Sequence, residues 1–145
     1  MRLFIGLLLV LPLLSACSSK SADLRCESAT TSAPFLNETF NLRYQDSATI
    51  QGENLRLVFS EVDGDSRCPV DVQCITEGNA RVEVTATRSP DAAQVLTLNT
   101  SGALATQASY LNYQVTLLSV VPYPESTHPI NTADYCLSLR VSKNA

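Results

Sequence analysis

The sequence predicts an all-β, disulfide-stabilised domain, either an antiparallel β-sandwich of immunoglobulin-like size or a small barrel. Three observations predict this fold class. Several short segments after residue 37 alternate between apolar and polar residues, turn-forming residues separate them, and cysteines are available for pairing. Roughly six to eight such strands fit the chain after its leader, and we favour two packed sheets over a barrel.

Residues 1–16 predict an export signal, with a positive charge near the start, an apolar run over residues 3–14 and small residues after it. The apolar run is shorter than the roughly 20 residues of a membrane-spanning helix. The letters LSAC at residues 14–17 resemble the bacterial lipobox. The resemblance implies acylation of Cys17 with fatty acids such as palmitate, cleavage just before it, and stable anchoring to the membrane. Because Ser18 follows Cys17, the resemblance favours the outer membrane as the location of the protein.

Residues 17–36 predict the lipidated cysteine and a flexible tether, because Ser, Thr and Ala are frequent and no period is visible. A flexible chain from Cys17 to Cys26 spans roughly 15–18 Å. We therefore expect the folded domain over residues 37–145, close to a membrane of the cell envelope, on its periplasmic or its outer face.

Alternation defines the strands expected within this domain. The clearest candidates are residues 54–62, 79–87, 113–121 and 134–142, and weaker ones are residues 39–44, 47–51 and 94–99. In the segment 113–121 the apolar phase shifts after Leu117, which places Leu118 and Val120 on the other face. This shift predicts a central or a bulged strand.

The cysteines predict disulfides, because four of the five remain once Cys17 carries lipid, an even number in an exported chain. Their spacing favours a local bridge between Cys68 and Cys74. The other pair would then be Cys26 with Cys136, since the alternation of the last strand places Cys136 on its outer face, within reach of the tether. Spacing alone leaves the other two pairings open.

The segment DGDSRCPVDVQC, residues 63–74, lies between two predicted strands. With its flanking strands and the later runs YQVTLLSVVPYP and DYCLSLRV, it resembles a family of bacterial secreted and lipid-anchored proteins without an established activity, which share a DSRCP-x(4)-C motif. The resemblance covers residues 38–142 and strengthens the predictions of the fold and of the disulfide staple. Members of that family often carry tryptophan two positions after the second cysteine, where this chain has Thr76.

Four interpretations of this segment compete. A structural staple is the simplest, with Arg67 pairing with a carboxylate or covering an apolar edge. A calcium loop would use four carboxylates, those of Asp63, Asp65, Asp71 and Glu77. The EF-hand spacing of such ligands is absent. The third interpretation is a thiol redox centre, but the Cys-x-x-Cys motif at a helix start that such centres use is also absent. Recognition of a partner would use the loop itself, with Arg67 as its anchor.

Composition bears on the class of function. The net charge of −4, without a cluster of cations, argues against nucleic acid as a partner. The single histidine, His128, lies in a polar loop without a nucleophile motif or metal-ligand spacing, so no catalytic residue, metal or other cofactor is predicted. The tyrosines are expected to pack in the core rather than stack on sugar rings.

We therefore expect a non-catalytic binding or structural module, anchored by lipid, whose partner is an envelope protein or a glycan. Such a module should carry an apolar or aromatic patch on a sheet face or around Arg67. An inhibitor that presents residues 63–77 to an enzyme, or a small envelope hydrolase, is the alternative.

Overall fold

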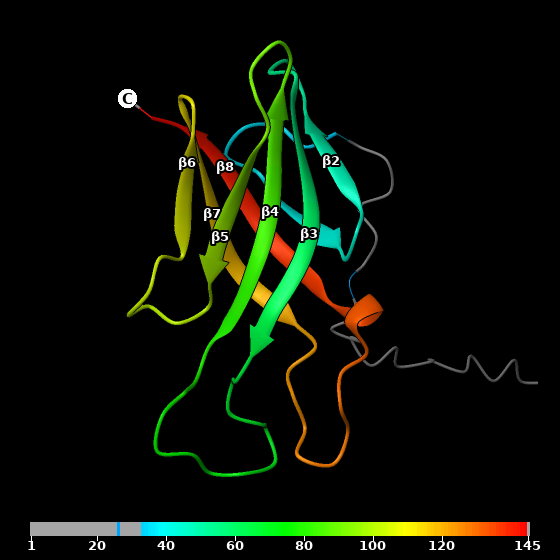
Figure 1. The fold of residues 1–145 in the computed structure, drawn as a ribbon, viewed down its shortest axis with the longest axis vertical. Helices are drawn as coiled ribbons and strands as arrows, with labels where there is room; N and C mark the ends of the chain where they lie inside the picture. Colours follow the sequence, from blue (N-terminus) through cyan, green and yellow to red (C-terminus); the bar gives the residue numbers. More distant parts are fainter. Residues whose placement is uncertain (1–25, 27–32, 145) are drawn as a thin grey trace, which may run out of the picture.

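The computed structural model describes Cys26 and residues 33–144. Its elements are β1 (Thr39–Arg43), β2 (Ser47–Ile50), β3 (Leu55–Asp65), β4 (Ala80–Arg88), β5 (Gln94–Asn99), β6 (Gln107–Tyr110), β7 (Tyr113–Val121), the 3-10 helix η1 (Thr132–Asp134) and β8 (Cys136–Lys143). They form two antiparallel sheets, with strand orders β1-β8-β7-β6 and β2-β3-β4-β5 (Figure 1). The sheets do not close on each other, so the predicted sandwich is confirmed and the barrel is not.

The core forms where the alternating apolar side chains of the two sheets meet. Leu55, Leu57 and Phe59 of β3 are fully buried, as are Val82 and Val84 of the neighbouring β4. Successive side chains of a strand point to opposite faces, so this period of two buries one face of each sheet. Each such burial contributes roughly 1.5–3 kcal/mol, and the core is the base that holds the loops in place.

The seven predicted strand segments all form strands, and the structure adds β6. The sequence of β6, QASY, alternates polar and apolar residues over only four positions, which is too short a run for the pattern to predict a strand. The phase shift in β7 is a bulge, because its register against β8 shifts between Leu117 and Ser119. Leu118 is exposed, but the bulge returns Val120 to the core, so the expectation that Val120 lies on the other face was wrong.

The domain begins earlier than the boundary expected at residue 37. Pro34 is buried, and its carbonyl accepts a hydrogen bond from the Gln51 amide at 2.9 Å. The Asn37 amide in turn donates to the Val141 carbonyl at 2.7 Å. Residues 33–36, which composition assigned to the tether, are therefore part of the domain. Composition cannot reveal backbone hydrogen bonds to strands that lie far along the chain.

Two disulfides join the predicted pairs, Cys26–Cys136 and Cys68–Cys74, with Cα–Cα distances of 5.6 and 5.9 Å. Cys136 is buried at its bridge rather than open on the outer face of the sheet. On the adjacent strand β1, the Arg43 guanidinium donates to the Cys26 carbonyl at 2.8 Å. The two disulfides indicate folding in an oxidising, extracytoplasmic compartment.

The export signal, Cys17 and most of the tether lie outside the described residues. Cys26 marks where the tether joins the domain. In the part of the chain that the structure describes, no helix is long and apolar enough to cross a membrane.

Candidate functional site

Two loops lie at the same end of the sandwich, which we call the loop end (Figure 1). The stapled loop, residues 66–79, joins β3 to β4 and contains the Cys68–Cys74 disulfide. The β7–β8 loop comprises residues 122–131. The topology brings the two loops together because β3 and β7 end here and β4 and β8 begin here. The disulfide from Cys26 reaches Cys136, the first residue of β8, so Cys26 is fixed at this end of the domain too.

The two loops brace each other through direct hydrogen bonds. The Val70 amide donates to the Pro124 carbonyl at 3.0 Å. The Ser126 amide donates to the Asp71 carboxylate at 2.8 Å, and the Ser126 hydroxyl donates to its other oxygen. These hydrogen bonds lower the pKa of Asp71, first through the hydroxyl and then through the amide. Asp71 is therefore an ionised brace between the loops at neutral pH.

The base of the stapled loop continues the β3–β4 ladder. The Ser66 amide donates to the Asn79 carbonyl and the Cys68 amide donates to the Glu77 carbonyl, both at 2.8 Å. Gly78 makes this close pairing feasible, because its φ is +71° and a Cβ there would lie 1.8 Å from the Ser66 carbonyl oxygen. The base of the loop is thus an irregular, hydrogen-bonded extension of the sheet.

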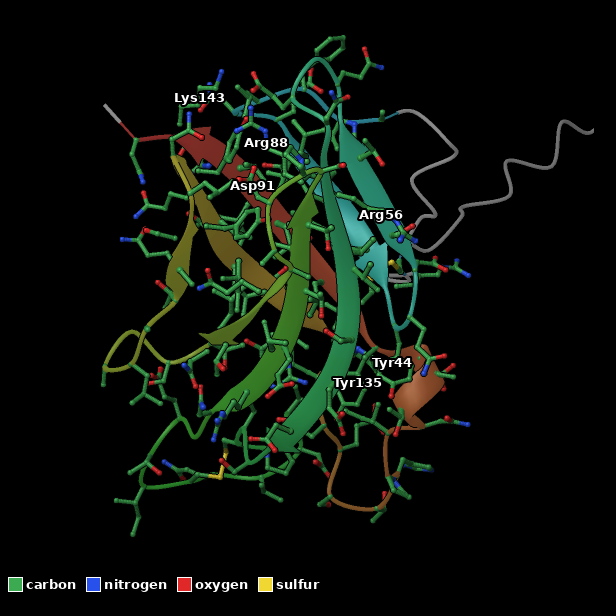
Figure 2. All side chains as sticks on the ribbon, turned by 45° about the horizontal axis from the view of Figure 1, so that its top comes forward. Tyr44, Arg56, Arg88, Asp91, Tyr135 and Lys143 are labelled. Carbon is green, nitrogen blue, oxygen red and sulfur yellow. A yellow bond between two sulfur atoms is a disulfide. The ribbon has the colours of Figure 1, made fainter. Side chains whose placement is uncertain are left out.

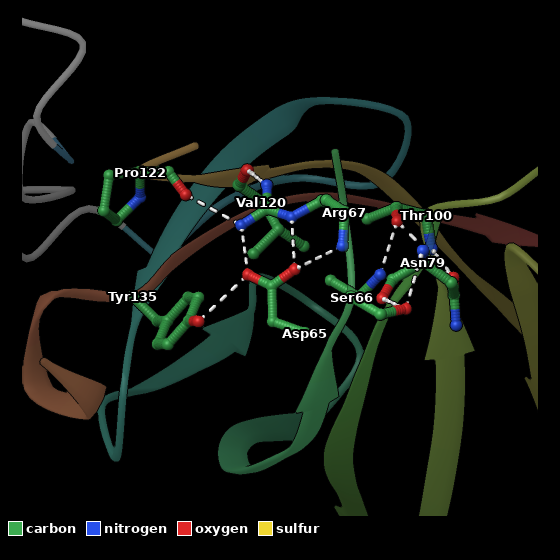
Figure 3. A network of polar contacts seen from close by, with 9 residues as sticks. Asp65, Ser66, Arg67, Asn79, Thr100, Val120, Pro122 and Tyr135 are labelled. Atoms are coloured by element: carbon green, nitrogen blue, oxygen red, sulfur yellow. Dashed lines mark hydrogen bonds and ion pairs between the residues drawn. The ribbon is translucent and has the colours of Figure 1, made fainter. Parts of the chain in front are cut away.

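Arg67 is buried beneath the loop end and ties the two sheets together (Figure 3). Its Nε and Nη2 donate to the two oxygens of Asp65 at 2.9 and 2.6 Å, with side chains only 4% and 8% exposed. Its Nη1 and Nη2 also donate to the carbonyls of Val120 and Pro122. The predicted pairing of Arg67 with a carboxylate is confirmed. Its donors face inward, so Arg67 shapes the loop from inside the domain.

Two tyrosines complete the surroundings of this ion pair. The Tyr135 hydroxyl donates to Asp65 at 2.9 Å. The Tyr123 ring lies over the Arg67 guanidinium, whose central carbon is 4.7 Å from the centroid of the ring. Burial alone would raise the pKa of Asp65, but the hydrogen bonds from Arg67 outweigh it and hold that pKa below its ordinary value. Burial and the hydrogen bond to Asp65 raise the pKa of Tyr135 to about 12. At neutral pH the cluster therefore holds a carboxylate, a guanidinium and a neutral phenol.

Asn79 connects the stapled loop to a third loop, residues 100–106, between β5 and β6. Its Oδ1 accepts hydrogen bonds from the amides of Thr100 and Ser101, each at 3.1 Å. Its Nδ2 donates to the side-chain oxygen of Asn99, which is itself buried, at 2.9 Å. This connected set of polar contacts fixes the base of the stapled loop on the side that faces the β5–β6 loop (Figure 3).

Apolar side chains are exposed on both loops above this rigid base. They are Val70 at 65%, Val72 at 46%, Ile75 at 104% and Tyr123 at 56% exposure. We call these four residues the apolar tip. Isolated exposed apolar residues are ordinary, but several on adjoining braced loops form the kind of surface that interfaces use. Of the four, Tyr123 lies against Arg67, around which an apolar or aromatic patch was expected.

The carboxylates of the calcium interpretation do not converge. Their partners are Arg81 for Asp63, Arg67 for Asp65, Ser126 for Asp71 and Ser101 for Glu77. Among Cys26 and residues 33–144, no group of three or more His, Cys, Asp or Glu residues is placed to hold a metal ion. The oxygens that the sequence offered for calcium serve instead to fix and orient the loops.

His128 lies on the β7–β8 loop with its side chain 78% exposed. Its Nδ1 is 3.1 Å from a Glu125 carboxylate oxygen and 2.9 Å from the Thr127 hydroxyl. Asp134, the next acidic residue along the chain, lies in the exposed turn of η1. These surroundings give His128 a solvated position rather than one that could hold a substrate.

A second cluster of charges lies at the opposite end of the sandwich, where Arg88 and Lys143 are close together (Figure 2). Both cations lie near the ring of the buried Tyr113, 5.7 and 5.9 Å from its centroid. Glu53 accepts a hydrogen bond from the Tyr113 hydroxyl at 2.6 Å and pairs with Lys143 at 2.8 Å. The cluster covers a core tyrosine, in line with the packing role expected for the tyrosines.

Sequence reasoning missed several residues that build the loop end. Tyr135 was expected in the core, but no local pattern links it to Asp65, far earlier in the chain. Asn79 and Tyr123 likewise act through long-range contacts. The role of Gly78 was also missed, although a glycine next to a predicted strand is a signal for close backbone approach.

No family model, no curated protein and no solved structure matches this chain.

Proposed function

We propose that the protein is a lipid-anchored, non-catalytic binding module of the bacterial cell envelope and that the loop end is its binding surface. The observation that carries the proposal is the exposure of the apolar tip on a backbone that is already fixed. A surface ordered before binding avoids part of the entropy that ordering a loop costs on association, about 0.5–1.5 kcal/mol for each long side chain immobilised. Val70 and Ile75 then provide apolar area that a partner can cover.

The rigid base supports this role because each element of it acts on the loops. The Cys68–Cys74 disulfide closes the stapled loop, and Arg67 holds the loop to the end of β7 from below. Asp71 holds it to the β7–β8 loop. A domain that needed only a connection between β3 and β4 would not require three independent restraints on it.

The lipid anchor rests on the lipobox that ends at Cys17 and on the oxidising compartment that the disulfides indicate. Intact-mass analysis of the protein from isolated envelopes tests it. We expect a mature chain that starts at Cys17 with the added mass of acyl groups, and release of Cys17→Ala from the membrane fraction. A mature start elsewhere, or an unmodified cysteine, would contradict the anchor.

Co-purification from detergent-solubilised envelopes tests the binding surface. We expect a partner that is recovered with the wild-type protein but lost with the double variant Val70→Ser, Ile75→Ser. Val95→Ser is the matched control, because Val95 is also aliphatic and 54% exposed but lies on β5. Equal recovery with the double variant would remove the loop end as the binding surface.

An inhibitor that presents the stapled loop to an enzyme is a second candidate, which the restraints on the loop favour, since inhibitory loops bind in a preformed conformation. The β7–β8 loop lies against the stapled loop and covers one side of it through Pro124 and Ser126. A narrow catalytic cleft would have to accept both loops together. This is why we place a broader binding surface first.

A further inference from the structure

We infer that the partner of the loop end is a protein of the same membrane, with an apolar groove whose rim carries Lys or Arg side chains. The inference rests on the proposed function, because it names the partner of that surface. Three observations carry it: the charges around the apolar tip, the chemistry of the tip itself, and the point at which the tether joins the domain.

The charges that surround the apolar tip are acidic. The two loops contain one basic residue, Arg67, which is buried and neutralised by Asp65, and one histidine, at position 128. Their exposed charged side chains are otherwise Asp71, Glu77 and Glu125. A partner surface of opposite sign speeds encounter and selects the correct partner, whereas a surface of like charge is rejected. The rim of the partner should therefore be basic.

The same charges argue against a lipid bilayer as the occupant. Asp71 lies between Val70 and Val72, so neither valine could enter the acyl region without bringing a carboxylate with it. An ionised aspartate is unfavourable in hydrocarbon. Surfaces that dock on anionic lipid are basic, and this one is not.

A glycan partner fits less well than a protein. Sugar-binding surfaces present aromatic faces, but three of the four residues of the apolar tip are aliphatic, and the one aromatic, Tyr123, already lies over Arg67. Aliphatic side chains are best covered by an apolar groove of another protein.

The tether places that protein near the bilayer. Cys26 is bridged to the first residue of β8, at the loop end, and stands nine positions after Cys17, whose acylation we propose; a flexible chain of that length spans roughly 15–18 Å. A partner that meets the apolar tip therefore lies close to the membrane surface. This favours a protein held in or on the same membrane over a freely diffusing one.

Site-specific photocrosslinking in isolated envelopes tests the inference, with full-length protein and p-benzoylphenylalanine in place of Ile75. We expect a protein adduct whose yield falls severalfold between about 50 and about 500 mM salt, since such salt screens surface charges. The variant Glu77→Gln, Glu125→Gln should lower the yield at low salt and remove its salt dependence, while Asp91→Asn at the opposite end should change neither. The probe in place of Leu111 is the positional control, because Leu111 is 49% exposed and lies between β6 and β7, where β7 begins and so opposite to the loop end.

Thermal unfolding of the charge variants should match that of the wild type, since both substituted carboxylates are exposed and a glutamine at position 77 keeps an oxygen that can accept the Ser101 hydroxyl. Adducts only to lipid would overturn the inference in favour of a bilayer. A protein adduct that salt and Glu77→Gln, Glu125→Gln leave unchanged would overturn the basic rim, and equal adducts from position 111 would overturn the orientation. Each of these results leaves the proposed function intact if co-purification still requires Val70 and Ile75.

Discussion

The Arg67 guanidinium forms a two-point ion pair with the Asp65 carboxylate while its remaining donors reach carbonyls at the end of β7, in the opposite sheet. A single buried arginine thus joins the strand that leads into the stapled loop to the strand that leads into the β7–β8 loop. The relative position of the two halves of the apolar tip depends on this pair.

Arg67→Ala should lower the free energy of unfolding by about 3–5 kcal/mol, because it leaves Asp65 as an uncompensated buried charge. Arg67→Lys should recover little of this, since an ammonium cannot bind both carboxylate oxygens and the carbonyls together. Chemical denaturation of the purified domain measures the change. Arg81→Ala is the control, because its ion pair with Asp63 is about half exposed and should contribute less than about 1 kcal/mol. Equal effects of the two alanine variants would contradict the structural role of Arg67.

Gly78→Ala should destabilise the domain more than Gly52→Ala. Both glycines have positive φ, +71° and +77°, so both substitutions carry a backbone strain of roughly 1–2 kcal/mol. Only at Gly78 would the new Cβ overlap the Ser66 carbonyl oxygen, whereas at Gly52 nothing lies within 4 Å. The difference between the two midpoints of denaturation therefore isolates the close pairing at the base of the stapled loop. Indistinguishable midpoints would show that the loop adopts another base.

Removal of the two disulfides should have unequal costs. The loop-closure model gives roughly 2–3 kcal/mol for the short loop of Cys68–Cys74 and roughly 4–5 kcal/mol for the long loop of Cys26–Cys136. Paired alanine variants of each bridge, compared by urea denaturation, measure the two values. A larger loss from the short bridge would mean that it supports more of the native structure than its own loop.

The free energy of unfolding should decline as the pH rises from about 10 to about 12. Tyr135 keeps its proton in the folded protein up to a pKa of about 12, whereas in the unfolded chain it loses it near its ordinary pKa of 10. The unfolded state therefore binds fewer protons across that interval, and stability falls. In Tyr135→Phe this part of the decline should vanish, leaving a smaller one from Tyr113, whose pKa is raised by burial and by Glu53. An unchanged slope in the variant would contradict the buried contact with Asp65.

The sequence predicted the parts of the fold that local patterns control. The alternation in residues 113–121 indicated a strand with a shifted phase, and the structure has the bulge and the central position in its sheet. The cysteine spacing favoured the Cys68–Cys74 bridge, and the alternation of the last strand supported Cys26–Cys136. The strand β6 was missed, because an alternation of only four residues is too short to signal a strand, and these residues form one by pairing with β7.

The loop end was predicted only in outline. The segment around Arg67 and Asp65 was identified, and a carboxylate was expected as the partner of the arginine, but its burial was not. Burial arises from carbonyls and tyrosines brought in by β7 and by the chain before β8, contacts that follow from topology and not from spacing. The acidic residues suggested a calcium site, because the sequence alone does not distinguish carboxylates that bind a metal from carboxylates that accept hydrogen bonds from the protein.

The measurement that tests this account most directly is amide hydrogen exchange of the stapled loop, compared between the wild type and the Cys68→Ala, Cys74→Ala variant. The account predicts that the amides of Ser66, Cys68 and Val70 exchange slowly in the wild type, because each donates to a carbonyl. In the variant the amides of residues 68 and 70 should exchange faster. The Ser66 amide should still exchange slowly, because its neighbour Arg67 remains in place. Exchange of all three wild-type amides at the rate of an unstructured chain would contradict a binding surface that is fixed before its partner arrives.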